Sequence, residues 1–320
     1  MIYSGSSAID YLATQLDKND SEESSHWRMY HSKFKFHGNG FKGLQGFGGN
    51  PKPYRGLRFL LHKGFQHRIR LLGYKFPGFK NIDTLAAKIT AKQNRAYDSD
   101  VLRQSLTLAF LKTKLPPETL SDLNATACVI GDGFSSMTSL LLASRSVGRV
   151  VLVNLTKTLI VDLWYLRLWM GNEAFESSVD LVTEQDSLER ALTKPINSNN
   201  GCGRVLSIQA NNHELIRSCP IDLGINIVSM QEMNTPVIKS YFEDLRSVSH
   251  KNGLAFYCCN REEKILPDGT ATRFSEYPWH SDDNIVVDEL CPWTQQYYTF
   301  VPPFYRPYDG LIRHRLVNFS

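Results

Sequence analysis

The sequence predicts an α/β fold with a mostly parallel, doubly wound sheet, preceded by a region of helices and irregular segments. Short apolar runs at 127–130, 149–154, 204–209 and 225–228 have the length and composition of buried parallel strands. Turn-like and helix-like segments separate these runs. Such an alternation of strand and helix is typical of this fold class.

A proline-rich break at 115–117 separates the predicted sheet from the preceding sequence. Proline disfavours helix in the residue before it, so a helix ends here. We therefore expect an accessory region at 1–115 and the sheet domain at 116–320. Within the accessory region, 81–114 has apolar residues at helical spacing, and we expect its helices to cover a ligand site of the sheet.

The first predicted strand ends in a glycine turn, Gly131-Asp132-Gly133-Phe134, which precedes a helix-like segment. Glycine lets the backbone turn sharply and approach a bulky ligand, and the first turn of a helix has free N–H groups. The turn therefore predicts a cofactor site that these four residues contact. A G-x-G pattern is also compatible with an ordinary turn.

Polar residues lie where the second and third predicted strands end. Asn154 ends the second strand, and Gln209, Ala210 and Asn211 end the third. Ligands of open α/β sheets bind beyond the carboxyl ends of the strands, so we expect all four residues to contact the cofactor. An NAD-binding sheet favours an acidic residue where Asn154 stands, so the pattern disfavours NAD without excluding it.

The segment from Asp222 to Lys264 combines a buried strand, a polar elbow, a helix and a second buried strand. The elbow contains Met230, Gln231 and Glu232, and Pro236 fits the first turn of the helix that follows. At the end of a strand, Met230 and Gln231 are placed to contact a cofactor, and Glu232 a substrate. The alternative for Glu232 is an ordinary acidic residue at a helix N-terminus.

Motifs along most of the chain are similar to those of one enzyme family. They lie at 25–27, 130–134, 226–233, 241–242, 256–257, 260–261, 277–279, 288–293, 303–306 and 313–315. Through them the chain resembles the sugar O-methyltransferases of bacterial polysaccharide gene clusters. The resemblance implies a Rossmann-like class I methyltransferase fold with S-adenosyl-L-methionine as cofactor. It also implies methyl transfer to a hydroxyl of an activated sugar or a surface polysaccharide.

Two positions depart from the usual methyltransferase pattern. Val129 stands where an acidic residue commonly precedes the first glycine, and Asn154 where an acidic residue commonly binds the ribose hydroxyls. An amide binds a diol more weakly than a carboxylate does. We therefore expect weak cofactor binding, with Asp132 binding the ammonium group of the cofactor instead.

The sequence after Lys264 is rich in aromatic residues with charged residues among them. Aromatic faces stack on sugar rings and charged groups hydrogen-bond hydroxyls, so this mixture suits a sugar pocket. The expected substrate-binding residues are Asn260, Arg261, Trp279, Asp288, Glu289, Tyr305, Arg306 and His314. The alternative is an outer aromatic layer around two final strands.

The expected reaction needs an acceptor oxygen in line with the methyl group and benefits from a general base. We expect Glu232 to be that base, provided that burial raises its pKa. His280, flanked by Trp279 and Asp282, is the second candidate. The six cysteines have no metal-ligand spacing, so we expect reduced thiols and no metal.

A basic segment runs from Ser24 to Ile82, with twelve Lys or Arg, five His and no Asp or Glu. Its expected partner is the diphosphate of a nucleotide- or lipid-linked sugar. A membrane surface is the second candidate partner, because 58–72 has a basic amphipathic pattern, although a packed helix gives the same pattern. Nucleic acid is not expected, since the net charge is only +4 and no nucleic-acid motif occurs.

Two other functions are compatible with the sequence. One is an NAD-dependent sugar oxidoreductase or epimerase, and the other is a non-catalytic glycan-binding protein. The sequence has no run of about 18 apolar residues and no N-terminal leader, so we expect a cytoplasmic protein.

Overall fold

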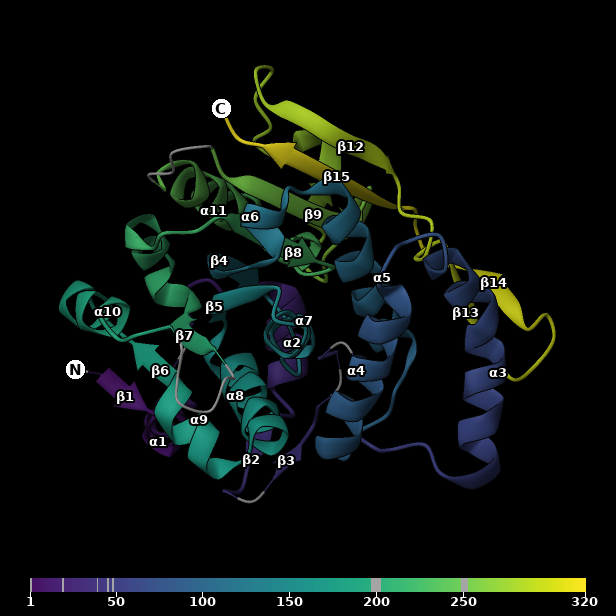
Figure 1. Cartoon of the computed structure of the whole chain (residues 1–320), viewed down its shortest axis with the longest axis horizontal. Helices are drawn as coiled ribbons and strands as arrows, with labels where there is room; N and C mark the ends of the chain where they lie inside the picture. The colour runs from purple at the N-terminus through teal and green to yellow at the C-terminus, as the bar shows by residue number, and fades with distance from the viewer. Residues whose placement is uncertain are drawn as a thin grey trace.

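The computed structural model describes residues 2–18, 20–38, 40–44, 46–47, 49–196, 203–248 and 253–320. Within these ranges a nine-stranded sheet crosses the molecule, with helices on both faces (Figure 1). Its strands in spatial order are β1 (Ile2–Ser4), β6 (Val179–Val182), β7 (Arg204–Gln209), β5 (Val147–Asn154), β4 (Asp122–Ile130), β8 (Leu223–Ile227), β9 (Ala255–Arg261), β15 (Ile312–Asn318) and β12 (Asn284–Leu290). The expected α/β fold class is confirmed.

The directions of the strands distinguish this sheet from a dinucleotide-binding one. The neighbouring strands β6, β7, β5, β4, β8 and β9 are all parallel to one another, whereas β1 is antiparallel to β6. The last strand, β15, lies between β9 and β12 and is antiparallel to both. A dinucleotide-binding Rossmann sheet is a mostly parallel sheet with the order 3-2-1-4-5-6. The observed sheet departs from that pattern, because β1 and β15 are antiparallel to their neighbours.

The central strands are apolar on both faces because helices cover both. Side chains alternate across a strand, so Val129 of β4 packs into one core while its neighbours Cys128 and Ile130 pack into the other. One core contains residues of α1 (Ser6–Gln15), α4 (Phe79–Lys92), α5 (Ser99–Lys114), α7 (Ser136–Ala143) and α8 (Thr156–Met170). The other core contains residues of α10 (Gln185–Leu192), η1 (Ala210–Ser218) and α11 (Thr235–Arg246).

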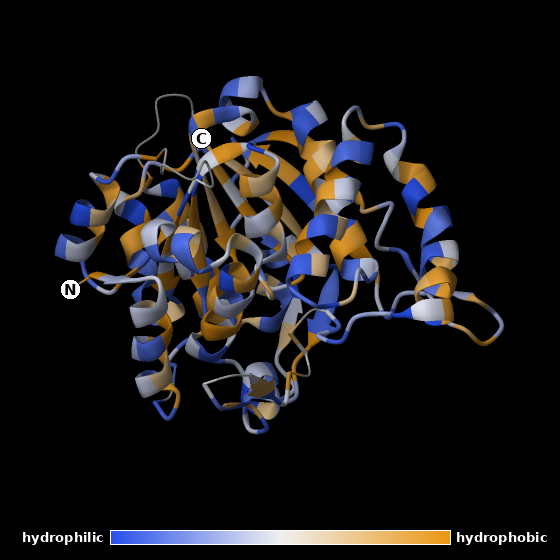
Figure 2. Cartoon of the chain, turned by 60° about the horizontal axis from the view of Figure 1, so that its bottom comes forward, coloured by the Kyte–Doolittle hydropathy of each residue, from blue (hydrophilic) through white to orange (hydrophobic). Residues whose placement is uncertain are grey.

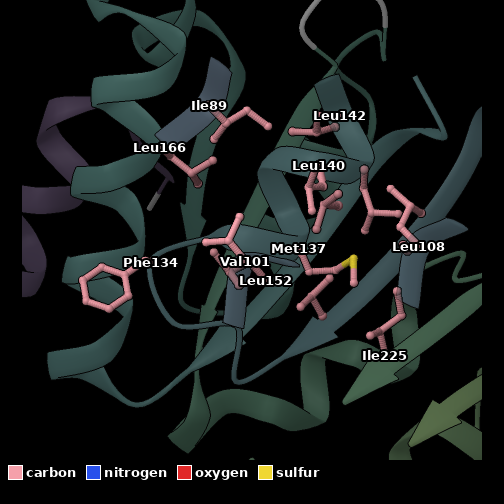
Figure 3. Packing of buried hydrophobic residues seen from close by; sticks show 14 of the residues in the cluster. Ile89, Val101, Leu108, Phe134, Met137, Leu140, Leu142, Leu152, Leu166 and Ile225 are labelled. Atoms are coloured by element: carbon pink, nitrogen blue, oxygen red, sulfur yellow. The ribbon is translucent and has the colours of Figure 1, made fainter. Parts of the chain in front are cut away.

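Figure 3 shows the first of these cores at close range. Helix residues Ile89, Val101 and Leu166 lie with Leu152 and Ile225 of the sheet, and all five are buried. The remaining helical elements are α2 (Ser25–His31), α3 (Gly56–Gly73), α6 (Pro117–Leu120), α9 (Asn172–Ser178), η2 (Met230–Glu232) and η3 (Phe274–Glu276). Three small two-stranded sheets pair β2 (Lys35–Phe36) with β3 (Phe41–Lys42), β10 (Glu263–Ile265) with β11 (Ala271–Arg273), and β13 (Gln296–Tyr298) with β14 (Tyr305–Pro307).

Two strands at one side of the sheet, β1 and β6, were not expected. The segment Val179–Val182 is short, and Ile2–Ser4 is shorter still, so neither gives a clear alternation in the sequence. Because β1 pairs with β6, the region before residue 116 contributes a strand to the main sheet. The boundary between 1–115 and 116–320 stays a prediction. The helices expected within 81–114 are present as α4 and α5.

In the described part of the chain, every helix is too short or too polar to cross a bilayer. The same residues contain no group of three or more side chains suited to hold a metal ion. Five cysteines are free and buried: Cys128, Cys219, Cys258, Cys259 and Cys291. Cys202 lies outside the described residues.

Candidate active site

A cavity of about 390 Å³ lies at the carboxyl ends of β4, β5 and β8. Open α/β sheets bind ligands in this position, and the volume is in the range of small-molecule pockets. Its wall on the sheet side contains Gly131, Asp132, Gly133, Asn154, Leu155, Ala210, Val228, Ser229, Gln231 and Glu232. The structure therefore brings the predicted glycine turn and the predicted elbow together at one site.

The glycine turn is fixed by backbone conformation and by close neighbours. Gly131 has a φ of 71° and Gly133 a φ of 66°, both in the left-handed region that favours glycine. A Cβ on Gly131 would lie 1.9 Å from Ser229 Oγ, and one on Gly133 would lie 2.5 Å from the carbonyl oxygen of Phe47. A side chain at position 131 would therefore collide with Ser229, and would not only occupy space that a ligand could fill.

Asp132 lines the cavity and also caps α7. Its Oδ1 accepts a hydrogen bond from the N–H of Met137 at 2.8 Å, and its Oδ2 accepts one from the N–H of Thr138 at 2.7 Å. Burial raises the pKa of this carboxyl, while these hydrogen bonds oppose the shift. Each oxygen has a further lone pair, and these are what the carboxylate offers to a ligand's ammonium group.

Asn154 is held by an acidic residue that the sequence reasoning missed. Its Nδ2 donates to Asp162 Oδ2 at 2.8 Å, and its Oδ1 accepts from the N–H of Leu155 at 3.0 Å. Asp162 is fully buried on α8 and also accepts from the N–H of Ser135 at 2.8 Å. Burial raises the pKa of Asp162 well above its usual value. Its signal in the sequence is an isolated acidic residue in an apolar helix, which is rarely buried without a partner.

Arg95 supports the turn from behind. Its guanidinium donates to Ser136 Oγ at 2.7 Å and to Gln93 Oε1 at 2.7 Å, and it lies 5.2 Å from the centre of the Phe134 ring. Phe134 itself is fully buried, packs edge-on against Tyr165, and lies outside the cavity lining. The structure therefore gives Phe134 a packing contact where the sequence predicted a cofactor contact.

Glu232 lies in a small cluster of titratable groups. Lys264 Nζ is 2.7 Å from its Oε1, and His26 Nε2 is 3.4 Å from the same atom. Burial raises the pKa of Glu232, and the charge of Lys264 opposes that shift. Burial, together with the charges of Lys264 and Arg261, lowers the pKa of His26 to about 4. At neutral pH His26 is therefore uncharged, and the ion pair at this site is the one between Glu232 and Lys264.

Hydrogen bonds to β9 hold the elbow in place. The N–H of Gln231 donates to Asn260 Oδ1 at 3.1 Å, and Gln231 Oε1 accepts from the N–H of Arg261 at 2.8 Å. Asn260 is fully buried and donates to Asn226 Oδ1 at 2.8 Å, so it positions the elbow and does not line the cavity. Met230 is fully buried as well. Of these predicted ligand contacts, Gln231 and Arg261 line the cavity.

Of the three cofactor contacts predicted at the end of β7, one lines the cavity and two do not. Ala210 lines the cavity, whereas Gln209 and Asn211 do not. The Gln209 amide donates to Thr156 Oγ1 at 2.8 Å, and Asn211 Oδ1 accepts from Ser21 Oγ at 3.1 Å. Both side chains therefore connect the sheet edge to neighbouring segments of the protein.

His280 is not brought near Glu232. It is exposed and outside the cavity lining, and its N–H donates to Asp283 Oδ2 at 2.9 Å. Trp279 packs against Phe242, and the Arg315 guanidinium lies 4.5 Å from its ring centre. Neither residue lines the cavity.

The other predicted substrate contacts also lie outside the cavity lining. Asp288 forms ion pairs with two arginines of β15, and Glu289 lies 3.4 Å from His314 Nε2. His314 is fully buried. Tyr305 donates to a main-chain carbonyl of α3, and Arg306 lies beside it on β14. These five side chains contact other parts of the protein, and none of them lines the cavity.

The cavity has a second wall that the sequence reasoning did not assign. Its residues come from the N-terminal region, from α5 and from the C-terminal segment, and they include Trp27, Phe47, Asp100, Arg103, Gln104, Thr107, Lys264, Trp293, Thr294 and Tyr308. The Arg103 guanidinium lies 4.8 Å from the centre of the Tyr308 ring, and Trp293 Nε1 donates to Thr107 Oγ1 at 3.2 Å. Trp27 and Trp293 lie within motifs of the resemblance, which was the available signal.

No protein-family model matches the chain, and no curated protein matches it. Similar solved structures include an rRNA methylase from Streptococcus thermophilus, at 11% identity and a TM-score of 0.34, over 67% of this chain and 95% of that one. The methyltransferase domain of bacterial CtHen1 is similar at 12% identity and a TM-score of 0.37, over 68% and 97% of the two chains. Magnesium protoporphyrin IX methyltransferase from Synechocystis PCC 6803, with bound SAH, is similar at 12% identity and a TM-score of 0.37, over 69% and 84%.

Proposed function

We propose that the chain is an S-adenosylmethionine-dependent O-methyltransferase that acts on a hydroxyl of an activated sugar or a surface polysaccharide. The observation that carries the proposal is a single cavity that contains the Gly131–Gly133 turn, Asn154 and Glu232. The turn and Asn154 form one end of the lining, at the strand ends. The elbow with Glu232 follows the next strand of the sheet.

The sheet side of the cavity suits a nucleoside with a charged tail. The left-handed glycines leave the backbone of the turn open to a ligand, and Asp132 has lone pairs for an ammonium group. Asn154 has one amide hydrogen beyond its bond to Asp162, and this hydrogen can be donated to a ribose hydroxyl. The cofactor would supply a methyl group on a sulfonium sulfur.

The second wall suits a sugar with polar substituents. Trp27, Trp293 and Tyr308 contribute aromatic side chains to the lining, and Arg261 contributes hydrogen-bond donors, whereas Arg103 already donates to Asp100 and to two main-chain carbonyls. This combination supports a carbohydrate acceptor more directly than Trp279 and Tyr305, the aromatic residues that the sequence predicted, which lie outside the lining.

Glu232 is the group that the structure offers as general base. Its raised pKa makes it a stronger base than an exposed carboxylate, and the charge of Lys264 opposes the rise that burial causes. It would take the proton of the acceptor hydroxyl as the oxygen forms a bond to the methyl carbon, and the electron pair of the broken carbon–sulfur bond would stay on the sulfur as a thioether. Arg261 and the aromatic wall would hold the sugar in line for this step.

Ligand-dependent thermal stability tests the cofactor. S-adenosylhomocysteine is expected to raise the melting temperature, because a ligand at about 100 times its Kd stabilises the folded state by about 2.7 kcal/mol. NAD is expected to have no effect. Stabilisation by NAD alone would favour a sugar oxidoreductase, and a response to neither would favour a non-catalytic glycan-binding protein.

Two arginine variants test the acceptor site. Arg261→Gln removes a donor from the cavity lining and is expected to raise KM for the sugar acceptor about tenfold. Arg306→Gln is the matched control, because Arg306 lies outside the lining, and its KM is expected to stay unchanged. Equal effects of the two substitutions would move the acceptor away from this cavity.

A further inference from the structure

One helix at the edge of the molecule has its polar and apolar faces inverted. In α3 (Gly56–Gly73) the buried positions are His62, Gln66, Ile69 and Gly73, so two of the four are polar. Leu57, Leu60 and Leu71 are exposed at 72%, 62% and 53%, and Phe59 and Leu61 are exposed as well. A helix that faces water normally has the opposite arrangement.

The polar residues on the inner face have partners. His62 Nδ1 lies 2.7 Å from the hydroxyl of Tyr298, and the Gln66 amide donates to the carbonyl of Tyr97 at 3.0 Å. Burial lowers the pKa of His62 to about 4, so this contact does not carry a charge at neutral pH. The orientation of α3 is thus fixed by contacts of its polar face, and the leucines are left exposed as a consequence.

The hairpin of β13 and β14 extends this apolar surface. The tip between the two strands exposes Phe300, Val301 and Phe304, with Val301 at 65%. Phe65 of α3 packs against Phe300 at 5.5 Å and against Phe304 at 5.4 Å between ring centres. Helix and hairpin lie at the same end of the molecule (Figure 1), and Figure 2 shows apolar colour on both. We call this unit, residues 55–75 with 296–307, the edge surface.

The edge surface is basic as well as apolar. Residues 55–75 contain six Lys or Arg and no Asp or Glu, and 296–307 add one Arg and no acid. Arg70 is neutralised by Asp83 at 3.0 Å. The other five cations of the helix segment are exposed: Arg55, Arg58, Lys63, Arg68 and Lys75. Exposed leucine and phenylalanine side chains with uncompensated cations around them are the pattern of a helix that lies in the headgroup region of an anionic bilayer.

We propose that the edge surface docks the protein on an anionic lipid bilayer, with α3 in the membrane plane and the hairpin tip inserted beside it. The charge selects this partner: a neutral apolar partner would leave five cations unpaired, and a second copy of the same surface would bring like charges together. Tyr74 and Tyr297, both exposed at the margin, suit the boundary between headgroups and water. The inference does not depend on the proposed methyltransferase activity.

Vesicle cosedimentation tests the proposal on the full chain. Vesicles of phosphatidylcholine with about a third of phosphatidylserine are expected to bind the protein, and vesicles of phosphatidylcholine alone to bind it at least tenfold more weakly. Added salt is expected to weaken binding to the anionic vesicles. Equal binding to both vesicle types, or no binding to either, would overturn the proposal.

Two variants with matched controls locate the surface. Arg58→Gln, Lys63→Gln and Arg68→Gln together are expected to weaken binding about a hundredfold, since each cation near an anionic surface contributes about fivefold. The control replaces the exposed Lys88, Lys92 and Lys114 with Gln, which changes the net charge equally, and is expected to bind within about threefold of the wild type. A control that weakens binding as much as the test variant would overturn the location.

The apolar part has its own pair of variants. Leu57→Ser with Leu60→Ser is expected to weaken binding at least about tenfold, whereas Leu168→Ser with Ile265→Ser, exposed elsewhere, is expected to have no effect. All four positions are exposed, so the urea midpoint should stay unchanged and serves as the check on folding. Sedimentation equilibrium gives the competing outcome: a dimer that the Leu57 and Leu60 substitutions abolish would assign the edge surface to a second copy and overturn the lipid proposal.

Discussion

Alanine at Gly131 is expected to destabilise the protein because of its collision with Ser229. The new Cβ would lie 1.9 Å from Ser229 Oγ and 2.5 Å from Ser229 Cβ, and the backbone has a φ of 71°. Two separate costs therefore combine at this position. One is the left-handed conformation of a residue with a side chain, and the other is overpacking against the elbow after β8.

The magnitudes of the two costs can be separated. A residue other than glycine in the left-handed region costs about 1–2 kcal/mol. Overpacking in a well-filled site costs about 1–3 kcal/mol. Gly131→Ala should therefore lower the free energy of unfolding by about 2–5 kcal/mol. In the double variant Gly131→Ala, Ser229→Gly the collision is gone, so about 1–3 kcal/mol should return as a coupling energy.

Equilibrium unfolding in urea measures these values for the two single variants and the double variant. Gly269→Ala is the matched control, because Gly269 has a φ of 88° and a Cβ there meets nothing within 4 Å. It should show the conformational cost alone. The reasoning fails if Gly131→Ala costs no more than Gly269→Ala, or if the substitutions at 131 and 229 are additive.

Three further predictions concern charge in the site. Glu232→Gln should lower kcat at least about tenfold and leave cofactor affinity unchanged, with Glu262→Gln as an exposed control. Lys264→Met removes the charge that opposes the raised pKa of Glu232, so the rise of kcat with pH should move to higher pH. Asn154→Asp places a second carboxylate in contact with that of Asp162. The free energy of unfolding of this variant should therefore fall as pH rises from about 4 to neutrality. The double variant Asn154→Asp, Asp162→Asn should regain the lost stability.

The direction of the pH dependence expected for Asn154→Asp follows from the linkage between proton binding and folding. Repulsion and burial raise the folded-state pKa of the carboxyl pair above the unfolded value, so the folded state binds protons more tightly than the unfolded state. Its stability is therefore greatest at low pH and is lost as pH rises through the raised pKa. A wild-type-like pH profile of the single variant, measured by urea unfolding, would contradict the interpretation of the contact between residues 154 and 162.

The central strands were predictable because they are buried on both faces. Near-continuous apolar runs such as 149–154 leave few alternatives to a covered parallel strand, and their carboxyl ends had to meet at one edge. This is why Gly131, Asn154 and Glu232 were correctly placed near one another. The short strands β1 and β6 lack that signal, since a short strand is identified by its pairing with a neighbour and not by its own pattern.

The second wall of the cavity could not be derived from local patterns. Trp27, Arg103 and Trp293 come from segments far apart in the sequence, and packing of the helices against the sheet brings them together. Residue type alone also misplaced the polar side chains after Lys264. Asp288 and His314 have the chemistry of a binding site, yet both are engaged on outer strands, where charges pair across β12 and β15.

The charges behind the glycine turn bear on which ligand the cavity favours. Asp98, Asp132 and Asp162 share the buried guanidinium of Arg95, whose charge opposes the rise in pKa that burial causes in each carboxyl. Full ionisation of these groups would leave negative charge in excess beside the turn. A cationic ligand is attracted by that excess and holds the carboxyls ionised, whereas a pyrophosphate is repelled and would need them protonated. The turn therefore favours an ammonium or sulfonium group over a pyrophosphate, which agrees with the proposed cofactor.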